Sequence, residues 1–196
     1  MSGVNVAVVG ATGAVGEEFL RLFELRKYPI KSLKLLASAR SAGKKLKFAG
    51  KDYIVEELKA DSFKGVEHAF FSAGGSISKE FAPHAAKAGA IIIDNTSAFR
   101  YEPEIPLVIP EINPKDAFEY GARRIVANPN CTTIVALLPT FPLHQQFGLK
   151  RAVMSSYQAI SGAGAQAMEE LEQQMRDWAA GRPLQVKISP KQIAFN

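Results

Sequence analysis

The fold is decided by the stretch Val6–Phe19, which reads VAVVGATGAVGEEF. The β-branched and apolar residues Val4–Val9 predict a buried strand, and apolar residues three or four positions apart predict a helix over Ala14–Arg26. The turn between them carries glycines 10, 13 and 16, a looser form of the G-x-G-x-x-G pattern. A glycine turn that joins a strand to a helix predicts a doubly wound, Rossmann-like α/β fold.

Gly10, Gly13 and Gly16 suit the binding of a dinucleotide pyrophosphate. Without Cβ atoms, the backbone N–H groups of the turn can approach the phosphates, and the positive end of the helix dipole attracts them. The alternative is a glycine-rich turn that binds no ligand, and the strand before it and the helix after it argue against that alternative.

The alternation of strands and helices continues along the chain. A helix is expected over Ser78–Lys87, with Pro83 as a kink or break, and another opens at Thr132–Leu138. This order predicts a mostly parallel sheet with helices on its faces. Further strands are expected at Ser32–Ala37, Val66–Ser72, Ile91–Ile93 and Arg124–Ala127.

We expect a nucleotide-binding domain over residues 1–130 and the start of a second, catalytic and dimerisation domain over residues 131–196. In the second segment, Arg151–Gln158 predicts a strand and Ala163–Ala180 a long amphipathic helix. The sequence then stops in what is expected to be the beginning of a strand, which predicts a shortened chain. The apolar stripe expected on the helix consists of Met168, Leu171, Met175 and Trp178.

The end of the second strand predicts which dinucleotide binds. An NAD site usually has an Asp or Glu here, which binds the ribose 2′-hydroxyl. This chain has Ser38, Arg40 and Ser41 instead. An arginine pairs with a 2′-phosphate that a carboxylate would repel, so NADP is favoured over NAD. The alternative is that Arg40 is only a solvated loop residue.

The segment FFSAGG ends a later strand with the small residues Ser72, Ala73, Gly74 and Gly75. Open α/β sheets bind ligands at the carboxyl ends of their strands, and small residues there let a ligand lie against the backbone. We therefore expect Ser72 and Gly74 to contact the cofactor, although tight packing of the next helix would explain them nearly as well.

Cys131 is the one cysteine of the chain and stands in the stretch NPNCTT, where a strand ends and a helix begins. Backbone N–H groups and the helix dipole stabilise a thiolate at such a position. Beside a nicotinamide site, a thiolate predicts attack on an acyl carbon followed by hydride transfer. The alternative is a small buried cysteine of the core.

The chain offers three histidines as a base for this chemistry. His144 lies 13 positions after Cys131 on the expected helix, roughly 20 Å away at ~1.5 Å per residue, so it cannot act on the thiol directly. His68 and His84 are expected to be structural or surface residues. The base is therefore unidentified or absent from this chain.

The amino-acid composition limits the kinds of partner and ligand that the chain is expected to bind. The 196 residues are 47% hydrophobic and 22% charged, with a net charge of +5. The basic residues are scattered, which argues against nucleic-acid binding, and a basic surface suits a small anionic substrate. A single cysteine excludes an internal disulfide and a zinc site built on cysteine pairs, and no metal site is expected. No apolar run is long enough for a membrane span and no signal peptide is seen, so we expect a cytoplasmic protein.

The ordered set GATGAVG, ASARSAGK, SAGG, DNTSAFR, VIPEIN, NPNCTT and QAISGAGA resembles the bacterial aspartate-β-semialdehyde dehydrogenases over Val4–Asn196. The resemblance implies reduction of L-aspartyl-4-phosphate by NADPH to L-aspartate-4-semialdehyde with release of phosphate, in the synthesis of lysine, diaminopimelate, methionine and threonine. It also implies a homodimer for the full-length enzyme.

The resemblance also implies roles for individual residues. Thr12, Gly13, Ala14 and Val15 would bind the pyrophosphate, and Arg40 and Ser41 the 2′-phosphate. By the same resemblance, Cys131 would carry the acyl thioester and Arg100 would bind phosphate. Asn130 would bind the substrate and Gln158 would orient it, and Ser161 and Gly162 would belong to the loop beside the nicotinamide.

The chain departs from the family at its end. Family chains continue further, and that part carries the general-base histidine, a second substrate arginine and much of the dimer surface, so activity of these 196 residues alone is not expected. Two rival interpretations stay open: a related acyl-phosphate reductase such as N-acetyl-γ-glutamyl-phosphate reductase, and a non-catalytic fragment that binds NADP or a partner.

Overall fold

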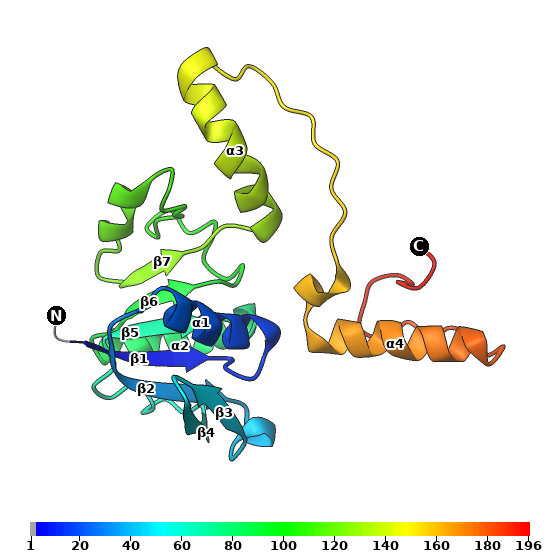
Figure 1. Cartoon of the computed structure of the whole chain (residues 1–196), viewed down its shortest axis with the longest axis horizontal. Coiled ribbons are helices and arrows are strands. Elements are labelled where there is room, and N and C mark those ends of the chain that lie inside the picture. The colour runs from blue at the N-terminus through cyan, green and yellow to red at the C-terminus, as the bar shows by residue number, and fades with distance from the viewer. Residues whose placement is uncertain (1–2) are drawn as a thin grey trace. The chain divides into compact units, whose positions relative to one another are not determined.

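The computed structural model describes residues 3–196 and contains a seven-stranded sheet in the order β3-β4-β2-β1-β5-β6-β7 (Figure 1). Every neighbouring pair is parallel except β3 and β4. This confirms the predicted mostly parallel α/β sheet. The strands are β1 (Val4–Val9), β2 (Ile30–Ala37), β3 (Lys45–Phe48), β4 (Lys51–Glu57), β5 (His68–Phe71), β6 (Ile91–Asp94) and β7 (Ile125–Ala127); the helices are α1 (Ala14–Leu25), α2 (Gly75–Lys87), α3 (Cys131–Phe147) and α4 (Ala165–Ala179).

Side chains alternate between the two faces of the sheet, and each face has its own apolar core. Val6 and Val8 of β1 pack with Leu20 and Phe23 of α1 on one face. Ala7 and Val9 face the other way, into a cluster with residues of α2. Helices cover both faces, so the strands of the parallel sheet are apolar on both sides, as the sequence pattern predicts.

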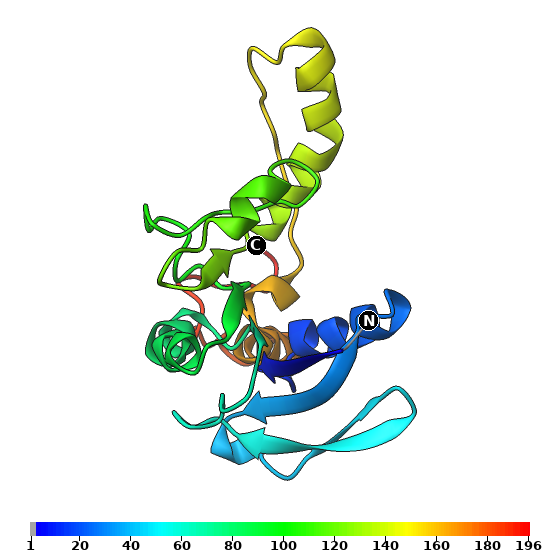
Figure 2. The ribbon, with the colours of Figure 1, turned by 90° about the vertical axis from the view of Figure 1, so that its left-hand side faces the viewer.

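A hairpin at one edge of the sheet was not predicted. β3 and β4 pair antiparallel and are joined by Ala49 and Gly50, both with positive φ, at 48° and 74° (Figure 2). Such values are those of a two-residue hairpin turn. Asn-Gly or Asp-Gly is the usual sequence there, so Ala-Gly gave a weak signal.

Pro83 does not break α2, although a kink or break was predicted there. The helix runs from Gly75 to Lys87 with Pro83 inside it. The proline lies on the exposed side of the helix, where water can bind the carbonyl that the missing N–H leaves without a donor. The proline is therefore tolerated.

The chain forms two compact units, one ending at Val153 and the other covering Met154–Asn196. The predicted strand at Arg151–Gln158 is wrong: these residues are exposed and belong to no strand. A strand needs the hydrogen bonds of a neighbouring strand, and within residues 3–196 no strand pairs with this segment. The strand expected at the end of the sequence is absent for the same reason.

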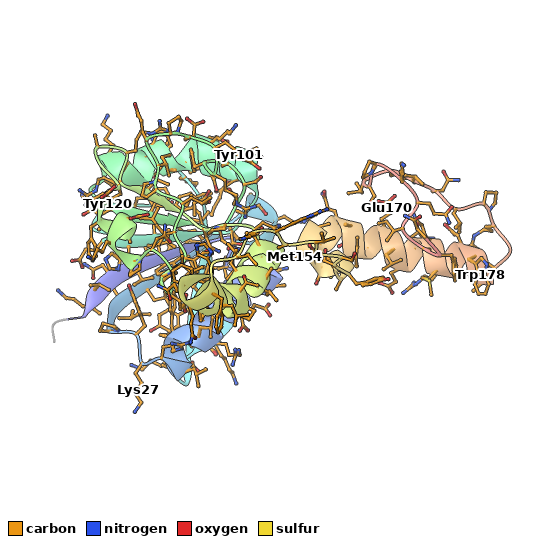
Figure 3. All side chains as sticks on the ribbon, turned by 90° about the horizontal axis from the view of Figure 1, so that it is seen from above. Lys27, Tyr101, Tyr120, Met154, Glu170 and Trp178 are labelled. Atoms are coloured by element: carbon orange, nitrogen blue, oxygen red, sulfur yellow. The ribbon has the colours of Figure 1, made fainter. Side chains whose placement is uncertain are left out.

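The second unit contains α4 and the irregular segment that follows it; Figure 3 labels Glu170 and Trp178 along the helix. Of the predicted apolar stripe, Leu171 is half-buried and the other three residues are exposed, with Met175 46% and Trp178 60% accessible. The buried face instead carries Glu170, Gln174 and Asp177. Among the helices of residues 3–196, none is both long and apolar enough to cross a membrane.

Candidate active site

The predicted cofactor residues of the first unit lie at the carboxyl ends of β1, β2 and β5. These parallel strands are neighbours, so their carboxyl ends share one edge of the sheet. This is the edge where open α/β sheets bind ligands. Gly10 to Val15 form the turn from β1 into α1, Ser38 to Ser41 follow β2, and Ser72 and Gly74 follow β5.

The glycine turn is held too tightly for side chains. A Cβ on Gly10 would lie 2.7 Å from the carbonyl oxygen of Ser72, and one on Gly16 would lie 2.3 Å from that of Gly10. Gly13 caps α1 without a side-chain hydrogen bond. The turn therefore brings bare backbone against Ser72 and leaves the first N–H groups of α1 available to an anion, which fits a dinucleotide pyrophosphate.

The residues after β2 adjoin this turn. Ala39–Ser41 form one turn of 3-10 helix, in which Ser41 is buried and Arg40 exposed. The Thr12 hydroxyl donates to Ser41 Oγ at 3.4 Å, which links the two loops. No carboxylate stands between Ser38 and Ser41, and Arg40 places a cation in this turn.

Arg100 is fastened to the segment that leads to Cys131. Its Nε donates to the carbonyl of Asn128 at 2.9 Å, and Nη2 donates to the carbonyl of Asn95 at 3.3 Å. These two contacts leave N–H donors of the guanidinium for an anion. The structure thus places a cation beside the stretch that ends in the thiol, which sequence reasoning alone would have read as a loop residue.

Cys131 is exposed and is the first residue of α3. Asn130 caps the helix, and its side chain accepts the N–H of Thr133 at 3.2 Å. The thiol is therefore no filler of the core. An accessible sulfur at the start of a helix is open to an electrophilic carbon of a ligand.

Asp94, at the end of β6, is a buried carboxyl that the sequence prediction missed. It is 0% exposed, and the hydroxyls of Ser78 and Thr96 each donate to it at 2.8 Å. Burial raises the pKa of Asp94, while these hydrogen bonds and the charge of Arg100 oppose the increase. The signal was present in DNTSAFR, a carboxylate directly after an apolar strand.

None of the three histidines is placed to serve Cys131. His68 begins β5, at the opposite end of the strands, and its Nδ1 lies 2.6 Å from the Tyr28 hydroxyl. His84 is near the C-terminal end of α2. His144 lies in the last turn of α3, where its Nδ1 accepts the N–H of Leu149 at 3.1 Å.

Gln158, Ser161 and Gly162 belong to the second unit. Ser161 and Gly162 lie in the 3-10 turn Ile160–Ala163, which follows Gln158. A Cβ on Gly162 would lie 2.1 Å from Nε2 of Gln158, so glycine lets the amide pack against this turn. The first unit by itself contains the glycine turn, Arg100 and Cys131. The second unit contains Gln158, Ser161 and Gly162.

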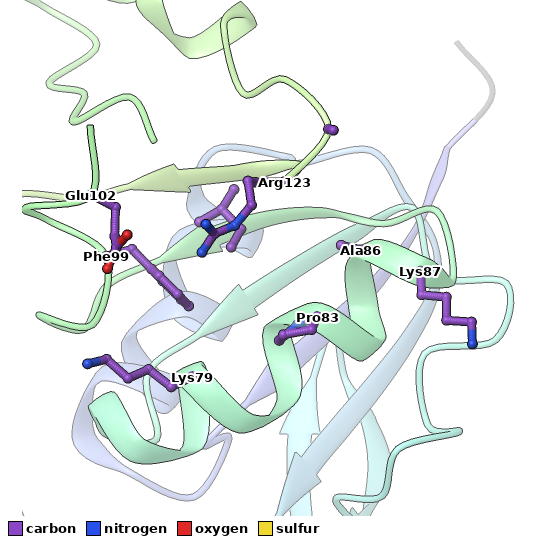
Figure 4. A pocket seen from close by; sticks show the side chains of 9 residues that line it. Lys79, Pro83, Ala86, Lys87, Phe99, Glu102 and Arg123 are labelled. Atoms are coloured by element: carbon purple, nitrogen blue, oxygen red, sulfur yellow. The ribbon is translucent and has the colours of Figure 1, made fainter. Parts of the chain in front are cut away.

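A hollow of about 550 Å³ lies along α2 (Figure 4). Lys79 and Lys87 of α2, with Phe99, Glu102 and Arg123, are part of its lining. None of the predicted cofactor or catalytic residues lines it. Among residues 3–196, no group of three or more His, Cys, Asp or Glu could hold a metal ion.

Comparison with known proteins identifies similar chains. The family "Semialdehyde dehydrogenase, NAD binding domain" matches residues 5–120, and "Semialdehyde dehydrogenase, dimerisation domain" matches residues 141–196. The predicted boundary between residues 130 and 131 lies between these two ranges and stays a prediction.

The relatives include an aspartate-semialdehyde dehydrogenase of Aquifex aeolicus, 50% identical over 99% of this chain and 58% of that protein. The crystal structure of aspartate semialdehyde dehydrogenase II from Vibrio cholerae, complexed with ASA, matches with a TM-score of 0.92 and 44% identity over 100% of this chain and 58% of that one. The crystal structure of aspartate semialdehyde dehydrogenase with NADP from Candida albicans matches with a TM-score of 0.62 and 28% identity over 76% of this chain and 48% of that one. The chain therefore spans 58% of the length of the Aquifex aeolicus relative.

Proposed function

Since the chain belongs to the semialdehyde dehydrogenase family, we propose that it is the nucleotide-binding and thiol-bearing part of an NADPH-dependent aspartate-semialdehyde dehydrogenase. Its reaction is the reduction of L-aspartyl-4-phosphate to L-aspartate-4-semialdehyde with release of phosphate. We further propose a cytoplasmic location, where a free thiol stays reduced. The observation that carries the proposal is the accessible thiol of Cys131 in the segment that Arg100 holds, at the same sheet edge as the glycine turn.

Each step of the proposed reaction is assigned to residues of this chain. The sulfur of Cys131 attacks the β-carbonyl carbon, a C–S bond forms, and phosphate leaves with the electron pair of the C–O bond toward Arg100. A bound nicotinamide supplies the hydride that reduces the thioester. By resemblance to the family, Asn130 and Gln158 would act on the substrate, and Ser161 and Gly162 would belong to the loop beside the nicotinamide. The thioester holds the acyl carbon on Cys131 as an electrophile to which hydride can add.

Cofactor selection follows from the residues after β2. We propose NADP, because Arg40 and Ser41 replace the acid that an NAD site would have. The relative from Candida albicans was solved with NADP. Thr12, Gly13, Ala14 and Val15 would hold the pyrophosphate, and Ser38, Ser72 and Gly74 lie at the same edge of the sheet.

A titration tests the cofactor proposal. The chain is titrated with NADPH and with NADH, and the change in nicotinamide fluorescence gives the two affinities. Arg40→Asp should weaken NADPH binding by about 1–3 kcal/mol and leave NADH binding nearly unchanged, because a charge-assisted contact is lost. Arg26→Asp, an exposed arginine beyond the other end of α1, is the control. Equal affinities in the unaltered chain would contradict the proposal.

Mass spectrometry tests the role of Cys131. With aspartate semialdehyde and NADP, the reverse reaction should leave an acyl group on the peptide that carries Cys131, and Cys131→Ser should remove it while NADPH still binds. N-acetylglutamate semialdehyde serves as the rival substrate. An adduct elsewhere, or an N-acetylglutamyl group on Cys131 formed as readily from the rival, would contradict the assignment. Because no histidine is placed to act as the base, turnover by the 196 residues alone is expected to be about 10²–10⁴-fold below that of an ordinary enzyme.

We also propose that the second unit contributes to a homodimer. The dimerisation family matches residues 141–196, and α4 exposes an apolar stripe that includes Met175 and Trp178. Exposed stripes of this kind mark protein interfaces. Sedimentation velocity of the chain and of Met175→Glu tests this: the variant should sediment as a monomer at concentrations where the unaltered chain self-associates.

A further inference from the structure

Three oxygen-bearing side chains are buried together behind the loop that carries Arg100. Ser78 of α2 is 0% exposed, Asp94 at the end of β6 is 0% exposed, and Thr96 in the following loop is 8% exposed. Buried polar groups persist where hydrogen bonds satisfy them, and a closed cluster of this kind fixes the backbone around it. The reaction described above uses none of the three.

The cluster sets the course of the loop. The Thr96 hydroxyl donates to Asp94 Oδ2 at 2.8 Å, and the Thr96 N–H donates to Oδ1 at 3.3 Å. The same hydroxyl oxygen accepts the N–H of Ala98 at 3.2 Å. Ser78 ties the carboxyl to α2 through a contact of 2.8 Å. The first turn of the loop after β6 is therefore bound to a fixed helix.

From this loop the contacts reach the thiol segment. The carbonyl of Asp94 accepts the N–H of Asn128 at 2.8 Å, and the Asn128 amide donates to Asn95 Oδ1 at 2.6 Å. Arg100 then donates to the carbonyl of Asn128, three residues before Cys131. The anchored loop and the thiol segment thus form one hydrogen-bonded assembly within the first unit.

We propose that Thr96, Asp94 and Ser78 are positioning residues, which hold the loop of residues 95–100 so that the Arg100 guanidinium stays beside the segment leading to Cys131. The inference deepens the proposed function and rests on it in one respect, the role of Arg100 as the cation for the departing phosphate. A displacement of about 1 Å at a reacting group can cost on the order of 10²-fold in rate, so an anchor outside the site can matter for the reaction.

The test measures the charge next to the thiol. Cys131 is the one cysteine of the chain, so alkylation is read from the intact mass. Iodoacetate and iodoacetamide have nearly the same shape, but only iodoacetate is an anion. The ratio of their rates with Cys131 reports a nearby cation, while changes in the thiol itself affect both rates and cancel.

Arg100→Ala should lower this ratio on the order of fivefold, because it removes the cation bound to the Asn128 carbonyl, three residues before the thiol. Thr96→Val removes the hydroxyl without changing any charge and should lower the ratio by about twofold or more, because Arg100 is then no longer held in place. Thr96→Ser restores the hydroxyl and should restore the ratio. Ser78→Ala, also neutral, is the second variant in case Thr96→Val does not fold, which far-UV circular dichroism shows.

The double variant Arg100→Ala with Thr96→Val separates positioning from a purely structural role. If Thr96 acts through Arg100, the second change should leave the ratio where Arg100→Ala alone put it. A folded Thr96→Val or Ser78→Ala variant with an unchanged ratio overturns the inference while the role of Arg100 stands. An unchanged ratio in Arg100→Ala overturns both the inference and the proposed role of Arg100.

Discussion

Asp94 in the first unit and Glu170 in the second are buried carboxylates that different kinds of hydrogen-bond donor hold. Asp94 in the first unit is 0% exposed and is bound by the hydroxyls of Ser78 and Thr96. Glu170 in the second unit is 8% exposed and accepts the backbone N–H groups of residues 187, 188 and 189 at 2.7, 3.1 and 2.7 Å. The first carboxyl is bound by side-chain hydroxyls at the end of a strand in an apolar sheet. The second is bound by main-chain N–H groups in a unit that has few buried apolar residues.

The difference extends to the whole of each unit. The first unit packs Phe63, Phe71 and Leu36 at 0% exposure into the core on one face of its sheet. Val8 and Leu35 are buried in the core on the other face. Among the described residues of the second unit, the buried apolar ones are two alanines, Ala167 and Ala194. We infer that hydrophobic burial stabilises the first unit, whereas specific hydrogen bonds from α4 hold the second.

The largest effect is expected from a truncation in the core of the first unit. Phe71 stacks on Phe63 with ring centroids 5.8 Å apart, and both are fully buried. Phe71→Ala should lower the free energy of unfolding by about 3–5 kcal/mol, because the cavity cannot collapse between a sheet and its covering helix. Urea unfolding followed by circular dichroism measures it.

Phe118→Ala is the matched control, since Phe118 belongs to the same unit but is 81% exposed. Its loss should change the free energy of unfolding by less than about 0.5 kcal/mol. If the two truncations cost the same, burial does not dominate the stability of the first unit, and the contrast between the units fails.

The next effect is local and belongs to the second unit. Glu170→Gln removes one carboxylate oxygen and the charge that three backbone N–H groups share. The amides of residues 187–189 should then exchange with solvent on the order of tenfold faster, which hydrogen exchange with mass spectrometry measures. The change should stay within the segment after α4.

Glu172→Gln provides the control on the same helix. The side chain of Glu172 is 63% exposed and pairs with Arg176, one turn later. An exposed pair contributes little, so exchange of residues 187–189 should stay as it was. Equal acceleration in both variants would show that helix charge, rather than the Glu170 contacts, holds the segment.

The same contrast explains what the sequence could and could not predict. The glycine turn and the apolar strands could be predicted from neighbouring residues alone. A turn with no room for Cβ atoms requires glycine at fixed positions, here 10 and 16, and this spacing is visible in the sequence. The residues after β1, β2 and β5 were therefore predicted at the correct edge of the sheet. Their roles in binding remain predictions.

The failures arise where the outcome depends on contacts distant in the sequence. Arg151–Gln158 has the composition of a strand but no neighbouring strand, and α4 has the stripe of a core helix but buries its polar face. Asp94 was missed because its partner Ser78 lies 16 positions away, on another element. No local pattern shows which distant backbone or hydroxyl will meet a given side chain.

A smaller effect is expected at the amino end of the sheet, where the Tyr28 hydroxyl lies 2.6 Å from Nδ1 of His68. Both groups are half-buried, and burial raises the pKa of Tyr28 and lowers that of His68. Tyr28→Phe should cost about 0.5–1.5 kcal/mol of unfolding free energy, since one hydrogen bond is lost and the ring keeps its stacking. Tyr101→Phe, on an exposed side chain of the same unit, should change nothing measurable; a larger loss there would show that the assay does not report this bond.

The smallest effect should come from pH alone, and it should have opposite signs in the two units. Burial raises the pKa of Asp94, so the folded first unit keeps a proton that the unfolded chain has lost. Its contribution is present below the ordinary aspartate pKa, about 3.9, and is lost as the pH rises through the higher folded value. The N–H groups of Lys187 and its neighbours lower the pKa of Glu170. Its contribution is present above about 4.3 and is lost as the pH falls through the lower folded value.

Comparing the unaltered chain with single variants separates the pH dependence due to Asp94 and Glu170 from that due to the other carboxylates. The stability of the unaltered chain minus that of Asp94→Asn, from urea unfolding between about pH 3 and 7, should fall as the pH rises. The exchange protection of residues 187–189 in the unaltered chain, corrected for intrinsic exchange and compared with Glu170→Gln, should rise over the same range. Parallel trends would break the comparison, because both carboxylates would then respond to burial alone. Opposite trends would show that burial decides the preferred form at Asp94, against the effect of its hydroxyl donors, whereas main-chain N–H groups decide it at Glu170.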